Sequence, residues 1–259
     1  MNRIAVVVLC FVTLVRGSAQ NLPDSSSAPD HPTNWTPYVL GGAAVTIFAL
    51  FPNDQRIYED IHGWKTRSPF LQNVSPKVSD LGSIGVPVIF TGLAGYGYLS
   101  GHNKELRVGI LGLESFIASG IATQVLKRLF SRERPFIATR PGGFWYGPTV
   151  YFKSPKNPNL QSFDSFPSGH VTSAFSAAAT LSDEYDTPWV TWTSYSLATA
   201  VAFSRIMESR HWASDCVAGA LVGFYSARLV RHLNDEYPSI NILPRADAGG
   251  YGLILCVRM

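Results

Sequence analysis

Six apolar runs dominate this chain of 259 residues, and proline, glycine or charged stretches separate them. The runs occupy residues 38–51, 84–100, 108–126, 171–181, 189–203 and 216–230. Apolar runs with breaks of this kind indicate helices. The chain contains 46% hydrophobic and 15% charged residues, which suits either one large core or several membrane helices. We therefore predict an all-α fold, a bundle of about six core helices that is associated with a membrane.

The first residues have the pattern of an export signal. Arg3 precedes an apolar run over 4–15, and the small residues 17–19 suit cleavage before Gln20. An uncleaved anchor is the alternative. Ser, Pro, Asp and Asn then mark a flexible lead-in. The sequence thus divides into a signal peptide, a lead-in, a helical domain and a C-terminal tail with a possible short strand, over residues 1–19, 20–37, 38–235 and 236–259.

Three polar clusters lie where apolar runs begin or end. They are Lys127 with Arg134-Pro135, the tetrad Pro167-Ser168-Gly169-His170, and Ser204-Arg205 with His211 and Asp215. Together they supply three cations, two imidazoles, a carboxylate and a glycine at a helix start. A phosphoryl group in transfer spreads negative charge over its oxygens, so its catalysis needs fixed positive charge and hydrogen-bond donors. The clusters therefore predict a site that handles phosphate.

The cations and the helix start have the properties of phosphate ligands. Lys127, Arg134 and Arg205 provide positive charge, and each arginine can bind two oxygens at once. Ser168 precedes a small, apolar run with helical character, so free backbone N–H groups and the helix dipole favour an anion there. Gly169 lets the backbone approach an oxyanion without an intervening side chain.

The two histidines suit the chemical steps. His211 and Asp215 are four residues apart, so on a helix both lie on one face and the carboxylate can accept the imidazole N–H. That contact would fix the tautomer and leave the other ring nitrogen free to attack phosphorus. His170 is then available to protonate the leaving oxygen and afterwards to activate water. The residues predict a covalent, two-step transfer.

The spacing of these clusters resembles the three-part signature of the type 2 phosphatidic acid phosphatase and vanadium haloperoxidase superfamily. Six residues separate Lys127 from Arg134-Pro135, and five separate Arg205 from His211. The resemblance covers roughly residues 84–231, and the three parts follow in order without a substitution. It implies a helical fold and a phosphatase activity.

The resemblance also implies a role for each signature residue. His211 would form a phosphohistidine, Asp215 would support it, and His170 would be the general acid. The phosphate ligands would be Lys127, Arg134, Ser168, Gly169 and Arg205.

Other polar residues near the clusters receive a plainer interpretation. Solvated surface charges are expected at Arg128, Arg132, Glu133 and Arg140. An intrahelical or surface pair is expected for Glu208 and Arg210. Cys216 lies in an apolar run, so we expect a buried free thiol there.

A long loop over 136–166 joins the first two clusters and contains several prolines and glycines. A loop of this length inside a compact domain is usually functional, so we expect it to border the substrate entrance. Its aromatic residues either line the path of an acyl or aromatic substrate or pack the loop onto its own domain. They are Phe144, Trp145, Tyr146, Tyr151 and Phe152.

Three functions agree with these features. The first is a phosphatase that hydrolyses phosphomonoesters or pyrophosphates of lipids, which the apolar helices favour. The second is a soluble, nonspecific periplasmic acid phosphatase, which the export signal and runs shorter than about 20 residues favour. The third is a vanadium-dependent haloperoxidase, in which the same residues would hold vanadate.

Charge and residue spacing narrow the partners. A net charge of +3 without a long basic run gives no support to nucleic-acid binding. No set of Cys, His and carboxylate residues has metal-ligand spacing, so neither a metal nor another cofactor is expected outside the vanadate alternative. The expected partner is a phosphorylated lipid or a small phosphate ester. The expected location is the bacterial cell envelope, either on the membrane with the site facing the periplasm or soluble in the periplasm.

Overall fold

The computed structural model describes residues 49–148, 160–236, 240–247 and 250–257. Its α-helices are α3 (Asp54–Arg67), α4 (Pro69–Asp80), α5 (Val86–Ser100), α6 (Asn103–Phe130), α8 (Gly169–Tyr185), α9 (Pro188–Met207) and α10 (Ala213–Glu236). Short 3-10 turns form η1 (Phe51–Asn53), η3 (Pro135–Ile137) and η4 (Leu160–Phe163), and a π-turn forms η2 (Leu81–Gly85). Through η2, α4 and α5 continue as one helix over Pro69–Ser100. The predicted all-α bundle is confirmed.

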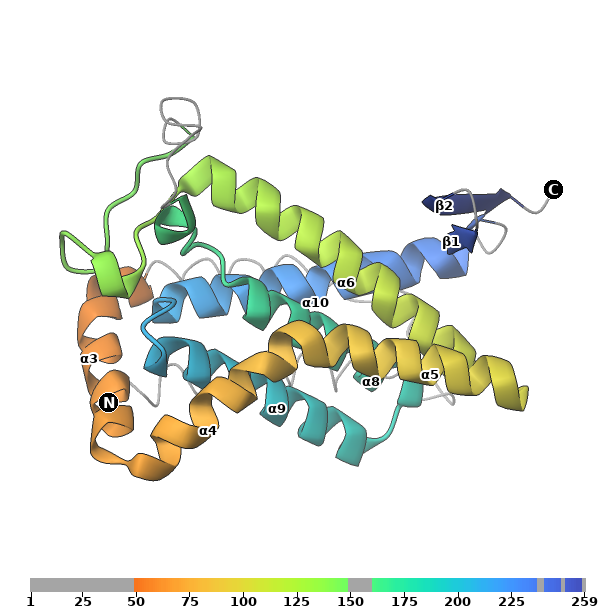
Figure 1. Cartoon of the computed structure of the whole chain (residues 1–259), viewed down its shortest axis with the longest axis horizontal. Helices are drawn as coiled ribbons and strands as arrows, with labels where there is room; N and C mark the ends of the chain where they lie inside the picture. Colours follow the sequence, from red (N-terminus) through yellow and green to blue (C-terminus); the bar gives the residue numbers. More distant parts are fainter. Residues whose placement is uncertain (1–48, 149–159, 237–239, 248–249, 258–259) are drawn as a thin grey trace, which may run out of the picture.

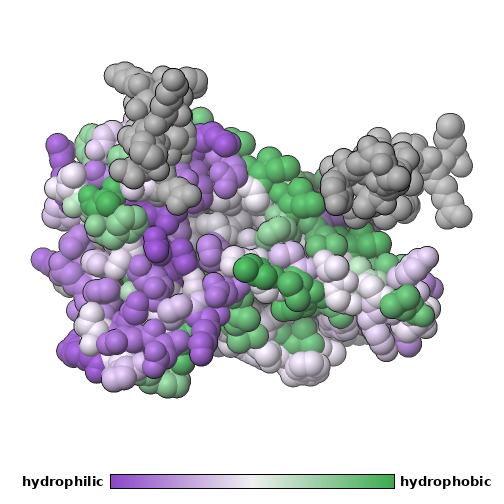
Figure 2. Space-filling model, in the orientation of Figure 1, coloured by the Kyte–Doolittle hydropathy of each residue, from purple (hydrophilic) through white to green (hydrophobic). Residues whose placement is uncertain are grey.

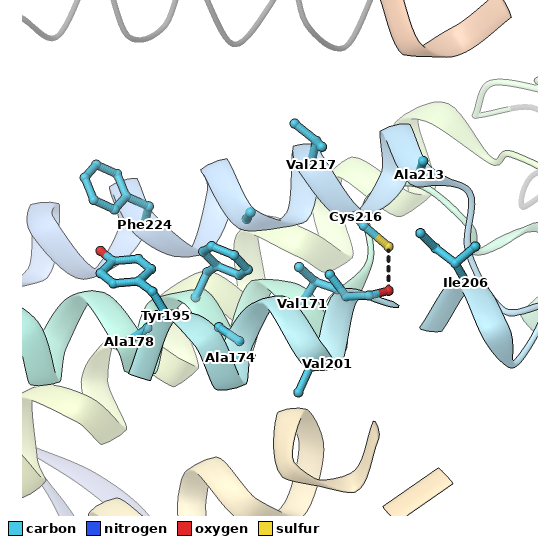
Figure 3. Packing of buried hydrophobic residues seen from close by; sticks show 14 of the residues in the cluster. Val171, Ala174, Ala178, Tyr195, Val201, Ile206, Ala213, Cys216, Val217 and Phe224 are labelled. Atoms are coloured by element: carbon cyan, nitrogen blue, oxygen red, sulfur yellow. Dashed lines mark hydrogen bonds between the residues drawn. The ribbon is translucent and has the colours of Figure 1, made fainter. Parts of the chain in front are cut away.

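The long helices run side by side, and α3 crosses one end of them (Figure 1). α8 lies at the centre, where it contacts α6, α9 and α10. Buried apolar residues of α8, α9 and α10 form the main core (Figure 3). Phe175 of α8 and Tyr195 of α9 meet there edge to face, with ring centroids 5.9 Å apart. A smaller cluster around Phe90 joins α5 to α6.

Small residues let α8 and α10 approach so closely that their backbones touch. A Cβ added at Gly219 of α10 would lie 2.6 Å from the carbonyl oxygen of Ser168, and one at Gly223 would lie 2.1 Å from that of Thr172. The backbone N–H of Ser168 also donates to the carbonyl of Asp215 at 3.1 Å. This packing sets the first turns of α8 and α10 side by side at the end of the bundle that α3 crosses.

Two helices were not predicted. The expected helix over 84–100 begins at Pro69 instead, after Ser68, whose side chain accepts from the N–H of Leu71 at 3.4 Å. No apolar run marks α3, because most of its residues are polar, although Asp54, Ile57 and Ile61 lie on one buried face. The spacing of these three residues is that of a helical stripe, so the signal was present in the sequence.

The C-terminal tail contains an antiparallel hairpin of β1 (Ile240–Asp247) and β2 (Gly250–Val257), in which Ile240 pairs with Val257. The possible strand near the C-terminus is therefore confirmed. The predicted signal peptide and lead-in, the start of the first apolar run and residues 149–159 of the long loop lie outside the described residues.

Among the described residues, two helices are long and apolar enough to cross a membrane: the continuous helix Pro69–Ser100 and α6. Large apolar side chains project from both, including Ile84, Val88 and Leu99 on the first and Ile121 and Val125 on the second. Figure 2 shows hydrophobic residues gathered over α5 and α6, whereas polar residues gather at the end of the molecule that carries α3.

Candidate active site

The fold brings the three sequence clusters to the polar end of the bundle. Lys127 lies in the last turn of α6, Arg205 in the last turn of α9, and Ser168 at the N-cap of α8. The segment just before α8 joins them. Lys127 Nζ donates to the carbonyl of Asp164 at 2.7 Å, and His211 Nδ1 donates to the carbonyl of Ser165 at 2.7 Å.

His211 is a buried imidazole with a defined tautomer. It lies between α9 and α10 and is 1% exposed. Because a carbonyl oxygen can only accept, the hydrogen bond to Ser165 places the proton on Nδ1 and leaves Nε2 with a lone pair. Burial lowers the pKa of His211 well below its usual 6.5, and the positive charges of Arg134, Arg205 and Lys127 lower it further. The ring is therefore neutral at pH 7.

Asp215 contacts His211 less directly than the sequence suggested. His211 precedes α10, so the pair does not share a helix face, and its Nδ1 is 3.9 Å from Asp215 Oδ2. Oδ2 instead accepts from Ser165 Oγ at 2.6 Å and from the backbone N–H of Trp212 at 2.9 Å. The carboxylate thus holds both Trp212, which follows the histidine in sequence, and Ser165, whose carbonyl accepts the hydrogen bond of the imidazole.

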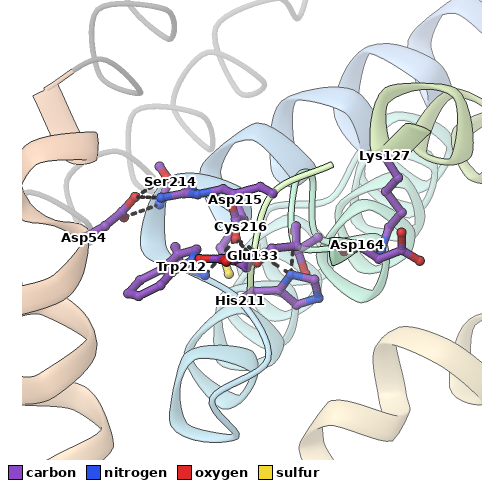
Figure 4. Close-up of polar contacts among 12 residues, drawn as sticks. Asp54, Lys127, Glu133, Asp164, His211, Trp212, Ser214, Asp215 and Cys216 are labelled. Carbon is purple, nitrogen blue, oxygen red and sulfur yellow. Dashed lines mark hydrogen bonds and ion pairs between the residues drawn. The ribbon is translucent and has the colours of Figure 1, made fainter. Parts of the chain in front are cut away.

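Arg132 completes a closed network around Asp215. Its Nη1 donates to Asp215 Oδ1 at 2.5 Å and its Nη2 to Asp54 Oδ2 at 2.7 Å, and all three side chains are buried. Its carbonyl accepts from the N–H of Ser165 at 3.1 Å. Three aromatic rings lie 4.7 to 5.4 Å from the guanidinium carbon: Phe51, Trp145 and Trp212. Figure 4 shows Asp54, Ser214, Asp215 and His211 lying in sequence along this network.

The expected surface position of Arg132 and Glu133 is wrong. Each is 1% exposed, because each charge has several buried partners. Glu133 accepts from the N–H groups of Thr139 and Phe144 at 3.0 and 2.9 Å, and from the hydroxyl of Tyr146 at 3.0 Å. Burial opposes ionisation, but these donors outweigh it and lower the pKa of Glu133. Glu133 therefore anchors the start of the long loop.

Of the other charged residues near the site, two are exposed as expected and two have partners that were not expected. Arg128 and Arg140 are exposed, as expected. Glu208 does not pair with Arg210. It accepts from Lys65 Nζ at 2.8 Å and from Ser75 Oγ, whereas the guanidinium of Arg210 lies over the ring of Phe136, 5.5 Å from its centroid.

The three predicted phosphate-binding cations lie close together. Lys127 is 7% and Arg205 9% exposed, and both are within electrostatic range of Arg134. Arg205 Nη1 donates to Ser79 Oγ at 2.5 Å, and its buried Nε has no hydrogen-bond partner among the described residues. Three positive charges in partly buried positions attract an anion strongly.

The start of α8 has the expected form. Ser168 is its N-cap, with φ −73° and ψ 111°, and Gly169 and His170 form its first turn. His170 is partly buried, and burial together with the positive charges of Arg205, Lys127 and Arg134 lowers its pKa to about 3. Its backbone packs against η2, since a Cβ added at Gly82 would lie 2.6 Å from the His170 carbonyl oxygen. The first turn of an α-helix leaves N–H groups without intrahelical partners, directed at this region.

The described aromatic residues of the long loop pack onto their own domain, one of the two expected outcomes. Trp145 contacts Phe51, Phe130 and Phe166, with ring centroids 5.1 to 5.9 Å apart. The ring of Tyr146 meets that of Phe163 at 5.1 Å. Cys216 is a buried free thiol, as expected.

The fold and the site together define an all-α bundle that gathers a neutral histidine, three cations and a helix N-terminus at one end. The family model of the PAP2 superfamily matches residues 109–237, about half of the chain. The chain belongs to this superfamily, that of the type 2 phosphatidic acid phosphatases, which confirms the resemblance seen in the sequence.

Curated relatives match part of the chain. A lipid A 1-phosphatase from Porphyromonas gingivalis is 38% identical over 80 residues, which are 30% of this chain and 18% of that protein. One from Rhizobium etli is 28% identical over 149 residues, 54% of this chain and 59% of that protein. The chain thus spans less than two thirds of the length of these relatives.

Two solved structures share the fold. One is Aquifex aeolicus LpxE, with a TM-score of 0.51 and 19% identity, covering 69% of this chain and 94% of that chain. The other is a transmembrane PAP2 type phosphatidylglycerolphosphate phosphatase from Bacillus subtilis, with a TM-score of 0.52 and 20% identity, covering 91% of this chain and 98% of that chain.

Proposed function

We propose that the protein is a lipid phosphatase, which removes phosphate from a phosphomonoester or pyrophosphate of a lipid through a phosphohistidine on His211. One observation carries the proposal. The His211 ring is buried and neutral, and Nδ1 donates to Ser165, so the lone pair of Nε2 is available as a nucleophile beside three cations.

The proposed reaction has two steps. The negative charge of the bound phosphate offsets the cations that lower the pKa of His170, so His170 carries a proton in the complex. Nε2 of His211 attacks phosphorus, the bond to the lipid oxygen breaks, and His170 donates this proton to that oxygen. His170 then takes a proton from water, which attacks the phosphohistidine and releases inorganic phosphate. Lys127, Arg134 and Arg205 neutralise the charge on the phosphoryl oxygens in both steps.

The start of α8 contributes backbone donors to the same oxygens. A Cβ added at Gly169 would meet the protein only at Thr123 Cγ2, at an ordinary 3.7 Å. The protein itself therefore leaves room for a side chain here. We propose that glycine occupies this position because a side chain would block a phosphoryl oxygen from reaching the N–H groups beside Ser168.

The exposed apolar face supports a lipid as substrate. It covers α5 and α6, and α6 carries Lys127 at its last turn, so a substrate embedded in a membrane beside this face could present its phosphate at the polar end (Figure 2). The names of the relatives make lipid A bearing a 1-phosphate the first substrate to test. We propose a membrane protein of the cell envelope with its site facing the periplasm. Extraction by detergent but not by high salt would support membrane insertion.

The test compares three enzymes on a lipid phosphate and on p-nitrophenyl phosphate. The wild-type protein should release phosphate faster from the lipid. His211→Ala should be inactive and form no acid-labile phosphoenzyme, whereas His232→Ala, at an exposed histidine of α10, should match the wild type. Equal activity of His211→Ala and the wild type would refute the proposal. EDTA should leave the rate unchanged, since protein cations supply the positive charge.

A further inference from the structure

α3 presents a row of polar side chains to the segment 207–214, which contains His211. The row consists of Asp54, Tyr58, His62 and Lys65. Residues spaced by four, four and three positions lie on one face of an α-helix. The family model matches residues 109–237, so α3 lies outside the matched region.

Asp54 begins the row and holds the C-terminal part of this segment. Its Oδ1 accepts from the backbone N–H of Ser214 at 3.0 Å, and its Oδ2 accepts from Ser214 Oγ at 2.5 Å. Through Arg132, the same carboxylate is linked to Asp215 (Figure 4). Asp54 is fully buried, so each of these contacts lacks competition from water.

Tyr58 and His62 hold the middle of the segment, at a point of backbone strain. Ser209 has φ 57°, in the left-handed region that a residue with a side chain adopts at a cost of about 1 kcal/mol or more. Its hydroxyl lies 3.1 Å from Tyr58 Oη and 3.2 Å from His62 Nδ1. His62 Nδ1 is also 2.9 Å from the carbonyl of Met207. A strained conformation persists where surrounding contacts fix it, and α3 supplies these contacts.

Lys65 ends the row. Its Nζ lies 2.8 Å from Glu208 Oε1, and Ser75 of α4 donates to the same oxygen. Both partners of the ion pair are about one fifth exposed, so its contribution is smaller than that of the buried contacts of Asp54.

We propose that α3 is a positioning element: its row fixes the backbone of the 207–214 segment and thereby the position of the His211 imidazole. The inference rests on the proposed function, because it assigns His211 the nucleophilic role. α3 is docked by its side chains rather than by a shared core alone. A displacement of about 1 Å at a nucleophile can cost about a hundredfold in rate, so this docking has a direct effect on catalysis.

The experiment compares Asp54→Asn with Asp60→Asn, the same change at an exposed position of the same helix. Each full-length protein is assayed in detergent on a lipid phosphate, well below its melting temperature. Amide hydrogen exchange is followed in peptides covering 207–216. For Asp54→Asn we expect kcat to fall ten- to a hundredfold, KM to change less than threefold, and exchange in these peptides to accelerate. Asp60→Asn should match the wild type in all three measurements.

Tyr58→Phe provides a second test if Asp54→Asn fails to fold. It removes the hydroxyl beside Ser209 and keeps the ring that packs on Trp212, 5.6 Å between centroids. We expect a two- to tenfold loss of kcat that disappears in a Ser209→Ala background, because both changes break one contact.

The two proposals fail in different ways. The role of α3 is overturned if the wild type is an active phosphatase and both Asp54→Asn and Tyr58→Phe have the same kcat and the same exchange rates as Asp60→Asn. In that case the proposed phosphatase function still stands. Absence of phosphatase activity in the wild type would overturn the proposed function and the catalytic role of α3 with it, and the exchange data would then report only on docking of the segment.

Discussion

Arg132 Nη1 donates to Asp215 Oδ1 at 2.5 Å, and both side chains are removed from solvent, with exposures of 1% and 0%. The other end of the guanidinium contacts Asp54, so one buried cation lies between two buried carboxylates. Buried charges are tolerated here because the guanidinium and the two carboxylates compensate one another. Removal of the guanidinium leaves two buried carboxylates without a cation.

Arg132→Met should therefore destabilise the protein by about 3–5 kcal/mol, the usual cost of breaking a buried ion pair. Methionine retains much of the volume, so the loss reflects charge rather than a cavity. Arg128→Met is the matched control, since Arg128 is exposed in the same part of the chain, and its effect should stay within about 0.5 kcal/mol. Thermal unfolding in detergent measures both. Similar melting temperatures for the two variants would show that the network contributes little.

Asp215→Asn should reduce kcat by about a hundredfold without abolishing turnover. His211 Nδ1 donates a hydrogen bond to the carbonyl of Ser165 at 2.7 Å, whereas Asp215 Oδ2 is 3.9 Å away, so the tautomer survives the substitution. The substitution instead weakens the hydrogen bonds that Asp215 accepts from Ser165 Oγ and from the backbone N–H of Trp212. Steady-state rates beside those of His211→Ala decide the matter. A loss near ten-thousandfold, as expected when a carboxylate itself orients the imidazole, would show that the two residues touch during turnover.

The contacts of Asp215 mark the limit of what its sequence position predicts. The spacing of four residues between His211 and Asp215 suggested a shared helix face, but α10 begins at Ala213, after the histidine. Which group accepts the hydrogen bond of the imidazole depends on where Ser165 lies, and Ser165 is held by the carbonyl of Arg132 and the carboxylate of Asp215. No pattern near either residue contains that information.

The apolar runs over 84–100, 108–126, 171–181, 189–203 and 216–230 predicted α5, α6, α8, α9 and α10, because a helix with a broad apolar face is apolar over much of its length. The three clusters predicted the gathering of Lys127, Arg134 and Arg205, since their spacing carries a recognisable signature. Arg132 and Asp54 were missed because each is isolated in the sequence, and a lone charge is usually solvated. Their burial depends on pairing between residues 78 positions apart.

Acid should lower the stability of the protein through His211 without protonating this nucleophile in the folded state. The unfolded chain binds a proton at this histidine near pH 6.5, but the folded protein, in which burial lowers the pKa, does not. The unfolded state therefore binds more protons below pH 6.5, and the free energy of unfolding falls as the pH decreases. This histidine should contribute a loss of about 1.4 kcal/mol one pH unit below that value. The imidazole meanwhile stays neutral and nucleophilic.

Melting curves between pH 7.5 and 5.5 test this contribution by comparing the wild type with His211→Asn, which should show a shallower decline. In the wild type, protonation of His211 should not cause kcat to fall near pH 6.5, because the folded protein keeps this imidazole neutral there. Identical pH slopes for the two proteins would show that His211 is protonated in the folded state as readily as in the unfolded chain.

Gly219→Ala should destabilise the protein by about 1–3 kcal/mol, the usual cost of overpacking. The added Cβ would lie 2.6 Å from the carbonyl oxygen of Ser168, and a backbone atom cannot turn aside as a flexible side chain can. Gly120→Ala in α6 is the control, because a Cβ there meets nothing within 4 Å and alanine favours a helix over glycine by up to about 1 kcal/mol. Since Ser168 caps α8 beside the cations, Gly219→Ala should also lower kcat measurably, whereas Gly120→Ala should not. Equal melting temperatures and rates in the two variants would mean that α8 and α10 can separate without disturbing the site.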